Sequence, residues 1–148
     1  MPPCLGVCLV TGGNGFLSSH LARQLSCLPD TTVHIVSADG SPTSPILHDV
    51  RVLSADICDA EVMARTVRTV KPNVIFHVAE KVDLRPGYSR EMHDTNVKAT
   101  RHLLQLARAQ DECSSFVLTS SIACVSNYNT VVGAKEECTP CAAHPTNG

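Results

Sequence analysis

The chain has 148 residues with an apolar content of 43%, enough for one compact domain around a hydrophobic core. A net charge of −2 leaves no basic surface to attract nucleic acid or an anionic membrane. An aromatic content of 3% argues against stacking on nucleic-acid bases. The eight cysteines occur without a secretion signal or a membrane-spanning stretch, which favours free thiols and a cytoplasmic location. Cys138 and Cys141 have CxxC spacing without a second pair, so no metal site is predicted.

The first half of the sequence alternates strand and helix patterns. Residues 7–11 form a continuous apolar run that predicts a buried strand, and short strands are predicted at 33–36 and 50–53. Between the first two strands, leucines recur at helical spacing along one stripe: Leu17, Leu21, Leu25 and Leu28. The loop 39–45 is rich in glycine, serine and proline.

The second half continues the alternation. Asp59 is predicted to cap a helix whose buried face consists of Val62, Met63, Thr66, Val67 and Val70. After a strand at 74–78, Ser89 opens a longer helix with an inward side made of Met92, Asn96, Val97, Thr100, Leu103, Leu104 and Ala107. A fifth strand follows at 115–119, and 122–148 is predicted to be loop or poorly ordered tail. The pattern predicts one α/β domain over 1–148, a doubly wound parallel sheet.

The segment 11–18, Thr-Gly-Gly-Asn-Gly-Phe-Leu-Ser, lies between the first strand and the first helix. Gly12 and Gly15 occupy the turn positions, and Gly13 gives room for the backbone. Such a turn lets N–H groups and the positive end of a helix approach a dinucleotide pyrophosphate. The sequence therefore predicts a dinucleotide-binding fold.

Four motifs in this order, followed by 119–121 (Thr-Ser-Ser), resemble the extended short-chain dehydrogenase/reductase superfamily: 11–18, 56–57, 77–79 and 96–100. The runs 119–125 and 135–140 are most similar to its 3β-hydroxysteroid (sterol) dehydrogenase/decarboxylase branch. The resemblance implies a Rossmann-like domain that binds NAD(P), and a small-molecule substrate such as a sterol or other secondary alcohol. It leaves open a homodimer and membrane association of a longer form.

The motifs and the resemblance together predict which residues bind or border the cofactor. These are Thr11, Gly12, Gly13, Asn14, Gly15, Phe16, Leu17, Ser37, Asp39, Asp56, Ile57, Ala79 and Asn96. Asp39 stands at the spacing expected for the acid that binds a ribose hydroxyl, whereas the resemblance places that position at Ser37. We favour NAD because no arginine follows the second strand, and NADP is left open.

The resemblance gives some of these residues distinct roles. It implies that Asp56 and Ile57 contact the adenine, the alternative for Asp56 being a helix cap. It implies that the small Ala79 lets the cofactor cross the sheet edge and that Asn96 braces the region through backbone hydrogen bonds. Ser18 replaces the third glycine that the superfamily usually has, which predicts a strained packing of helix against strand.

Ser121 matches the superfamily serine that orients the substrate oxygen, and it is the predicted catalytic residue. The Tyr-x-x-x-Lys pair that takes the hydroxyl proton is missing, because Tyr88 and Tyr128 lack a lysine four positions later. The chain is therefore expected to be truncated before the sixth strand and the substrate-binding part. Two functions stay open, the cofactor-binding half of a dehydrogenase and a noncatalytic nucleotide-binding module. A nucleotide-sugar epimerase or dihydroflavonol-type reductase is a third.

Overall fold

A computed structural model describes residues 4–13, 15–40, 50–83, 89–121 and 135. The chain divides into two units, Met1–Leu118 and Thr119–Gly148. All helices and strands of the described residues belong to the first unit. The predicted tail 122–148 lies outside the described residues apart from Lys135.

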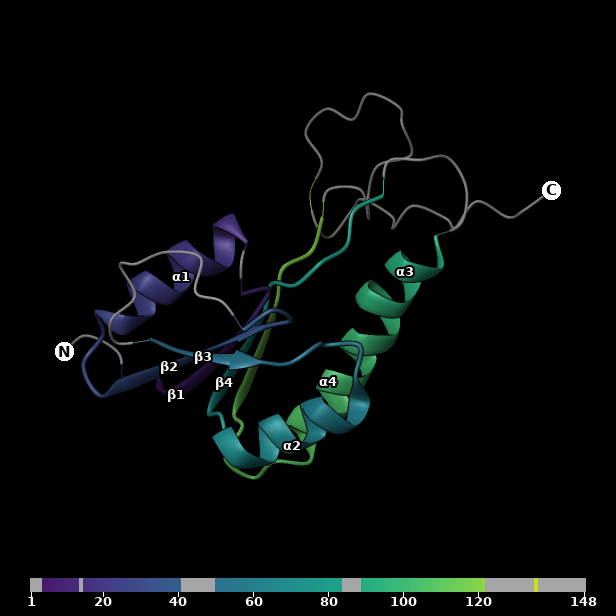
Figure 1. Ribbon diagram of the computed structural model, residues 1–148. Helices are drawn as coiled ribbons and strands as arrows, with labels where there is room; N and C mark the ends of the chain where they lie inside the picture. Colours follow the sequence, from purple (N-terminus) through teal and green to yellow (C-terminus); the bar gives the residue numbers. More distant parts are fainter. Residues whose placement is uncertain (1–3, 14, 41–49, 84–88, 122–134, 136–148) are drawn as a thin grey trace. The chain divides into compact units, whose positions relative to one another are not determined.

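The first unit is built on a five-stranded sheet in which every neighbouring pair is parallel. The strands are β1 (Gly6–Thr11), β2 (Thr31–Ser37), β3 (Val50–Ser54), β4 (Val74–His77) and β5 (Ser115–Leu118), in the spatial order β3-β2-β1-β4-β5 (Figure 1). The chain runs outward from β1 to β3 and then returns to the other side of β1. This reversal confirms the predicted doubly wound α/β sheet, and it brings the carboxyl ends of β1, β2 and β4 together.

One face of the sheet packs against α1 (Phe16–Ser26). Ala22 and Leu25 of α1 are buried against Cys8 and Val10 of β1, together with Val33 and Ile35 of β2. These side chains alternate along the strands, as burial on one face of a sheet requires. Leu17, predicted to share the buried stripe of α1, is instead 50% exposed, and Ser18 takes the buried position. The small Ser18 side chain is therefore enclosed where the first turn of α1 packs on the turn after β1.

The opposite face packs against α2 (Ala60–Val70) and α4 (Thr100–Arg108), which lie side by side in Figure 1. Its core joins Leu9 and Ile75 of the central strands to Met63 and Val67 of α2 and to Leu103 and Ala107 of α4. Since both faces of the central strands are covered, β1 and β4 carry near-continuous apolar runs.

Two side chains start helices as predicted. Asp59 is the N-cap of α2 and accepts hydrogen bonds from the N–H groups of Glu61 and Val62, at 3.1 and 3.0 Å. Ser89 is the N-cap of α3 (Arg90–His93) and accepts one from Met92. Helix α2 ends at Lys71, which adopts a left-handed conformation with φ of 49° just before Pro72.

The long helix predicted after Ser89 contains a π-helical segment, η1 (Asp94–Ala99), between α3 and α4. Leu103 and Ala107 face the core as predicted, but Val97 and Leu104 are 40% and 44% exposed. A π-helical turn holds more residues than an α-helical turn, so the inward face shifts along the sequence. A prediction based on a constant period of 3.6 residues was therefore wrong for these two positions.

Replacing Asp59 by alanine tests the start of α2. The Asp59→Ala variant loses two backbone hydrogen bonds at the helix N-terminus, and its free energy of unfolding should fall by about 1 kcal/mol. Urea denaturation followed by circular dichroism measures this change. Asp111→Ala removes an exposed carboxylate that has no hydrogen bond to another described residue, and its stability should stay within about 0.5 kcal/mol of the parent. Equal losses in both variants would contradict the capping role.

Candidate functional site

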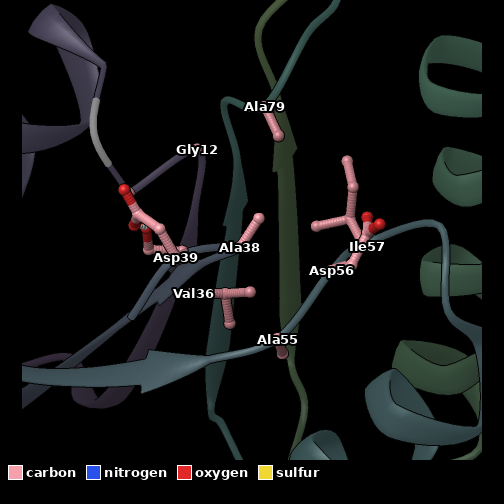
Figure 2. A pocket seen from close by; sticks show the side chains of 10 residues that line it. Gly12, Val36, Ala38, Asp39, Ala55, Asp56, Ile57 and Ala79 are labelled. Atoms are coloured by element: carbon pink, nitrogen blue, oxygen red, sulfur yellow. Dashed lines mark hydrogen bonds between the residues drawn. The ribbon is translucent and has the colours of Figure 1, made fainter. Parts of the chain in front are cut away.

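A cavity of about 300 Å³ lies where the strands end at the carboxyl edge of the sheet. Its lining comes from the turn after β1, the end of β2, the segment after β3 and the segment after β4: Gly12, Gly13, Val36, Ser37, Ala38, Asp39, Ala55, Asp56, Ile57 and Ala79. Figure 2 shows Asp39 on one side of this space and Asp56 with Ile57 on the other. Seven of the predicted cofactor residues thus meet here, and Val36, Ala38 and Ala55 are additional lining residues.

The glycine turn fits closely between its two neighbouring strands. Gly12 has a φ of +89°, and a β-carbon on it would lie 3.0 Å from the backbone of Ala79. A β-carbon on Gly13 would lie 2.5 Å from the β-carbon of Ser37. The Gly13 N–H donates to the carbonyl of Val36 at 2.9 Å, so this turn is tied to β2. Packing alone therefore requires glycine at both positions.

Helix α1 begins directly after this turn. Gly15 is the N-cap, and no side chain of the described residues caps it. The buried Ser18 hydroxyl is shared between the carbonyls of Gly12 and Gly15. Serine at the third-glycine position is therefore accommodated by hydrogen bonds to the turn. Phe16 and Leu17 are exposed and do not line the cavity, and Asn14 lies outside the described residues.

The two candidates for the ribose-binding position form one unit. The Ser37 hydroxyl donates to Oδ1 of Asp39 at 2.5 Å, and both residues line the cavity. Ser37 is buried at the strand end, whereas Asp39 is exposed two residues later. The hydrogen bond fixes the Asp39 carboxylate beside the cavity. Ser37 and Asp39, which the sequence offered as alternatives, are therefore hydrogen-bonded to each other at one place.

On the other wall, the Asp56 carboxylate is oriented by its own turn. Oδ1 of Asp56 accepts the N–H of Cys58 at 2.9 Å, and the adjacent Ile57 side chain is half-buried against the core. The helix-cap role belongs to Asp59, so Asp56 is not needed to begin α2. A carboxylate and an aliphatic surface thus stand side by side at the cavity.

A buried hydrogen-bond chain that the sequence analysis missed supports the Ala79 side. The Thr11 hydroxyl oxygen accepts the N–H groups of Val78 and Ala79, both at 3.2 Å, and lies 2.7 Å from Nδ1 of His77. Since its lone pairs serve the two N–H groups, its proton goes to Nδ1. Nε2 of His77 then donates to the Thr100 hydroxyl at 2.8 Å. Thr11, predicted to contact the cofactor, is fully buried, and its hydroxyl positions Ala79.

The same chain continues into the π-helical segment. The Thr100 hydroxyl donates to the carbonyl of Asn96 at 2.8 Å. The Asn96 side chain accepts from the N–H of Lys81 and donates to its carbonyl, each at 2.8 Å. Asn96 therefore ties η1 to the segment after β4 without lining the cavity. The signal available in the sequence was one polar histidine inside the apolar run 74–78.

Ser121 belongs to the second unit of the chain, and its catalytic role stays a prediction. Among the described residues no group of histidine, cysteine or acidic side chains could hold a metal ion, and Cys138 and Cys141 lie outside them. Five described cysteines are free, and of these only Cys8 is buried.

Comparison with known proteins decides the family. Residues 8–148 match the family described as NAD dependent epimerase/dehydratase. The chain belongs to this family. It is 33% identical over 139 residues to 3 beta-hydroxysteroid dehydrogenase/Delta 5-->4-isomerase of Mycobacterium tuberculosis, covering 89% of this chain and 36% of that protein. It is 30% identical over 136 residues to CDP-glucose 4,6-dehydratase of Salmonella typhimurium, covering 86% of this chain and 37% of that protein.

Solved structures of epimerases share the fold. A UDP-glucose-4-epimerase of Stenotrophomonas maltophila with bound NAD superimposes with a TM-score of 0.73 at 23% identity, over 95% of this chain and 44% of that one. The chain thus spans less than half the length of these relatives. In the part of the chain that the structure describes, no helix has the length and apolar character needed to cross a bilayer.

Substitution at Gly13 tests the packing of the turn. Gly13→Ala places a methyl group against Ser37, Ile35 and the carbonyl of Val36, and should lower the free energy of unfolding by about 1–3 kcal/mol. Gly15→Ala meets only oxygen atoms at 3.1 and 3.2 Å and should lower it less. Thermal and urea unfolding of the two variants provide the comparison. A Gly13→Ala variant as stable as the parent would contradict the close approach of turn and strand.

Acidification tests the His77 chain. Burial lowers the pKa of His77 below its ordinary value of 6.5, so the unfolded state binds more protons just below pH 6.5. Stability should therefore fall as the pH decreases from 6.5 toward the folded-state pKa. His77→Gln should make this dependence shallower, whereas His20→Gln, which removes an exposed imidazole, should leave it unchanged.

Other groups also have shifted pKa values, and their effects on the pH dependence of stability can be separated from that of His77. Burial, with help from Arg51, lowers the pKa of His34 as well, so some dependence should persist in His77→Gln. Hydrogen bonds lower the pKa values of Asp94 and Glu112. These two carboxyl groups change the stability only at a more acidic pH than His77 does. Unfolding midpoints between pH 4.5 and 8 measure the slopes. An identical slope in the parent and His77→Gln would show that the histidine is not held neutral.

Proposed function

We propose that the carboxyl-edge cavity binds the adenosine half of NAD and that the chain is the cofactor-binding part of an NAD-dependent oxidoreductase acting on a secondary alcohol. The observation that carries this proposal is the Ser37–Asp39 pair facing Asp56 and Ile57 across one cavity. Such an arrangement offers acceptors for ribose hydroxyls on one wall. The opposite wall offers a carboxylate for an amine and an aliphatic surface for a ring.

The described residues suit the adenosine half and the pyrophosphate of the dinucleotide. Ile57 contributes apolar surface for adenine, and the Asp56 carboxylate stands beside it as an acceptor for the exocyclic amine. The uncapped N-terminus of α1 supplies N–H groups and positive potential for the pyrophosphate. Ala79, held by Thr11, leaves room for the chain of the cofactor to cross the sheet edge. We assign Phe16 and Leu17 to this site through their backbone N–H groups, since their side chains face solvent.

The charge of the cavity favours NAD over NADP. Asp39 and Asp56 are its ionisable lining residues, and no lysine or arginine of the described chain lines it. A 2′-phosphate beside Asp39 would bring two negative charges together without a cation between them. NAD, whose ribose keeps the hydroxyl as a donor to Asp39, lacks this repulsion.

With NAD bound, the cofactor would supply the hydride acceptor for the carbinol carbon of the substrate, and the hydroxyl proton would leave to a general base, which the resemblance identifies as a Tyr-x-x-x-Lys pair. Ser121 orients the substrate oxygen by a hydrogen bond, as the resemblance implies. His77 lies too deep in the first unit to exchange a proton with substrate, and its role is to hold Thr11 and Thr100. We place the substrate among 3β-hydroxysteroids or sterols because the relative with 33% identity is a 3 beta-hydroxysteroid dehydrogenase.

A second candidate is a nucleotide-sugar dehydratase or epimerase. The 30% identity to CDP-glucose 4,6-dehydratase favours it, and its proposed NAD site would be the same. In a form extended to the length of these relatives, NADH formation with a 3β-hydroxysteroid would support the first candidate. Conversion of a nucleotide sugar without net NADH formation would support the second. In that form, Ser121→Ala should chiefly lower kcat.

Calorimetric titration of the chain with NAD tests the cofactor site. We expect saturable binding, weaker for NADP, and about tenfold weaker NAD binding for Asp39→Asn because a charge-assisted hydrogen bond to the ribose is lost. Asp111→Asn makes the same change in net charge away from the cavity and should bind NAD like the parent. Equal losses in the two variants, or no saturable binding by the parent, would contradict the assignment.

A further inference from the structure

A second cavity, of about 610 Å³, lies between the edge strand β3 and α2. Its lining residues are His34, Arg51, Val52, Leu53, Ser54, Val62, Arg65, Thr66, Thr69 and Val70. None of them lines the carboxyl-edge cavity. The space is thus a separate site, formed by the outer edge of the sheet and one face of α2.

The ionisable side chains that line this cavity are two arginines and a histidine. No carboxylate of the described residues lines it, and neither Arg51 nor Arg65 has an ion pair with a described residue. Lysines elsewhere in the first unit are paired, as Lys71 is with Glu112 and Lys98 with Asp94. Two unpaired guanidinium groups at one hollow make its potential positive.

His34 is the third ionisable side chain that lines this cavity. Its side chain is 9% exposed and lies directly opposite Arg51 in the pairing of β2 with β3. Nδ1 of His34 is buried and has no hydrogen-bond partner in the described structure. An unsatisfied buried nitrogen is costly, and the cost is least when Nδ1 carries the lone pair and Nε2 the proton. In this tautomer the ring is neutral, and Nε2 is its only donor.

We propose that the cavity between β3 and α2 binds a phosphate group, held between the guanidinium groups of Arg51 and Arg65. A guanidinium group donates two parallel hydrogen bonds to a phosphate, which makes arginine well suited to this anion. Thr66 and Thr69 of α2 line the same space, and their hydroxyl groups can supply further donors. Val52, Leu53, Val62 and Val70 provide an apolar wall, and the volume exceeds that of phosphate alone. The site therefore suits a phosphate ester of a small organic molecule as well as the free ion.

Nuclear magnetic resonance of the chain, titrated with inorganic phosphate at constant ionic strength, tests this proposal. We expect saturable shifts of the amide signals of 51–54 and 62–70 and of the His34 ring. Arg51→Gln and Arg65→Gln should each weaken binding about tenfold, because one charge-assisted donor pair is lost. Arg65 is exposed on α2, so its variant should fold even if the strand variant does not. Shifts confined to 12–18 would report binding at the glycine turn only and would overturn the second site.

Matched probes and a control variant sharpen the outcome. Arg68→Gln removes the same charge from α2 at a position that does not line the cavity and should bind phosphate like the parent. An equal loss in Arg68→Gln would overturn the site in favour of general charge attraction. Phenyl phosphate binding more tightly than inorganic phosphate would assign a phosphate ester, and equal binding would assign free phosphate. Benzoate binding as tightly as phenyl phosphate would overturn phosphate recognition.

Discussion

The close approach of the turn after β1 to the strands on either side is the constraint on which the rest of this structure depends. Gly12 touches the backbone of Ala79 beyond β4, and Gly13 touches Ser37 at the end of β2. Neither contact leaves space for a β-carbon. Three of the four chain segments that line the carboxyl-edge cavity are therefore held together by close contact.

The Thr11 hydroxyl strengthens this constraint from inside the sheet. It accepts two consecutive N–H groups where β4 ends, and so directs the chain at Ala79 toward the cavity. Its own orientation is fixed by His77, and that of His77 by Thr100 on the helical layer. Because every member of this buried chain has a partner, the cavity edge, the sheet and the helix behave as one hydrogen-bonded unit.

The sequence predicted the features that depend on local pattern. The glycine turn, the cap at Asp59 and the order of strands and helices follow from residue types at short spacing, and seven predicted residues do line one cavity. The sequence did not predict the Ser37–Asp39 hydrogen bond, because both residues were considered for the same ribose-binding position and only one of them was expected to fill it. The His77 chain joins residues 66 and 23 positions apart, which no local period reveals. The π-helical segment defeated the assignment of Val97 and Leu104 for a related reason, since a constant period cannot register an inserted residue.

Strand β2 contributes residues to both cavities. Ser37 lies at its carboxyl end beside the dinucleotide cavity, whereas His34 lies three residues earlier and faces the layer that contains α2. Successive residues of a strand point to opposite faces, so a single strand can serve both spaces without competition. Edge strand β3 has the same double use, because its residues 51–54 border the second cavity and the segment 55–57 borders the first. An edge strand paired on one side only is the least constrained part of such a sheet. A phosphate bound between Arg51 of β3 and Arg65 of α2 would link the strand to the helix. The segment 55–59, which contains Asp56 and Ile57, connects these two elements and would be restrained with them.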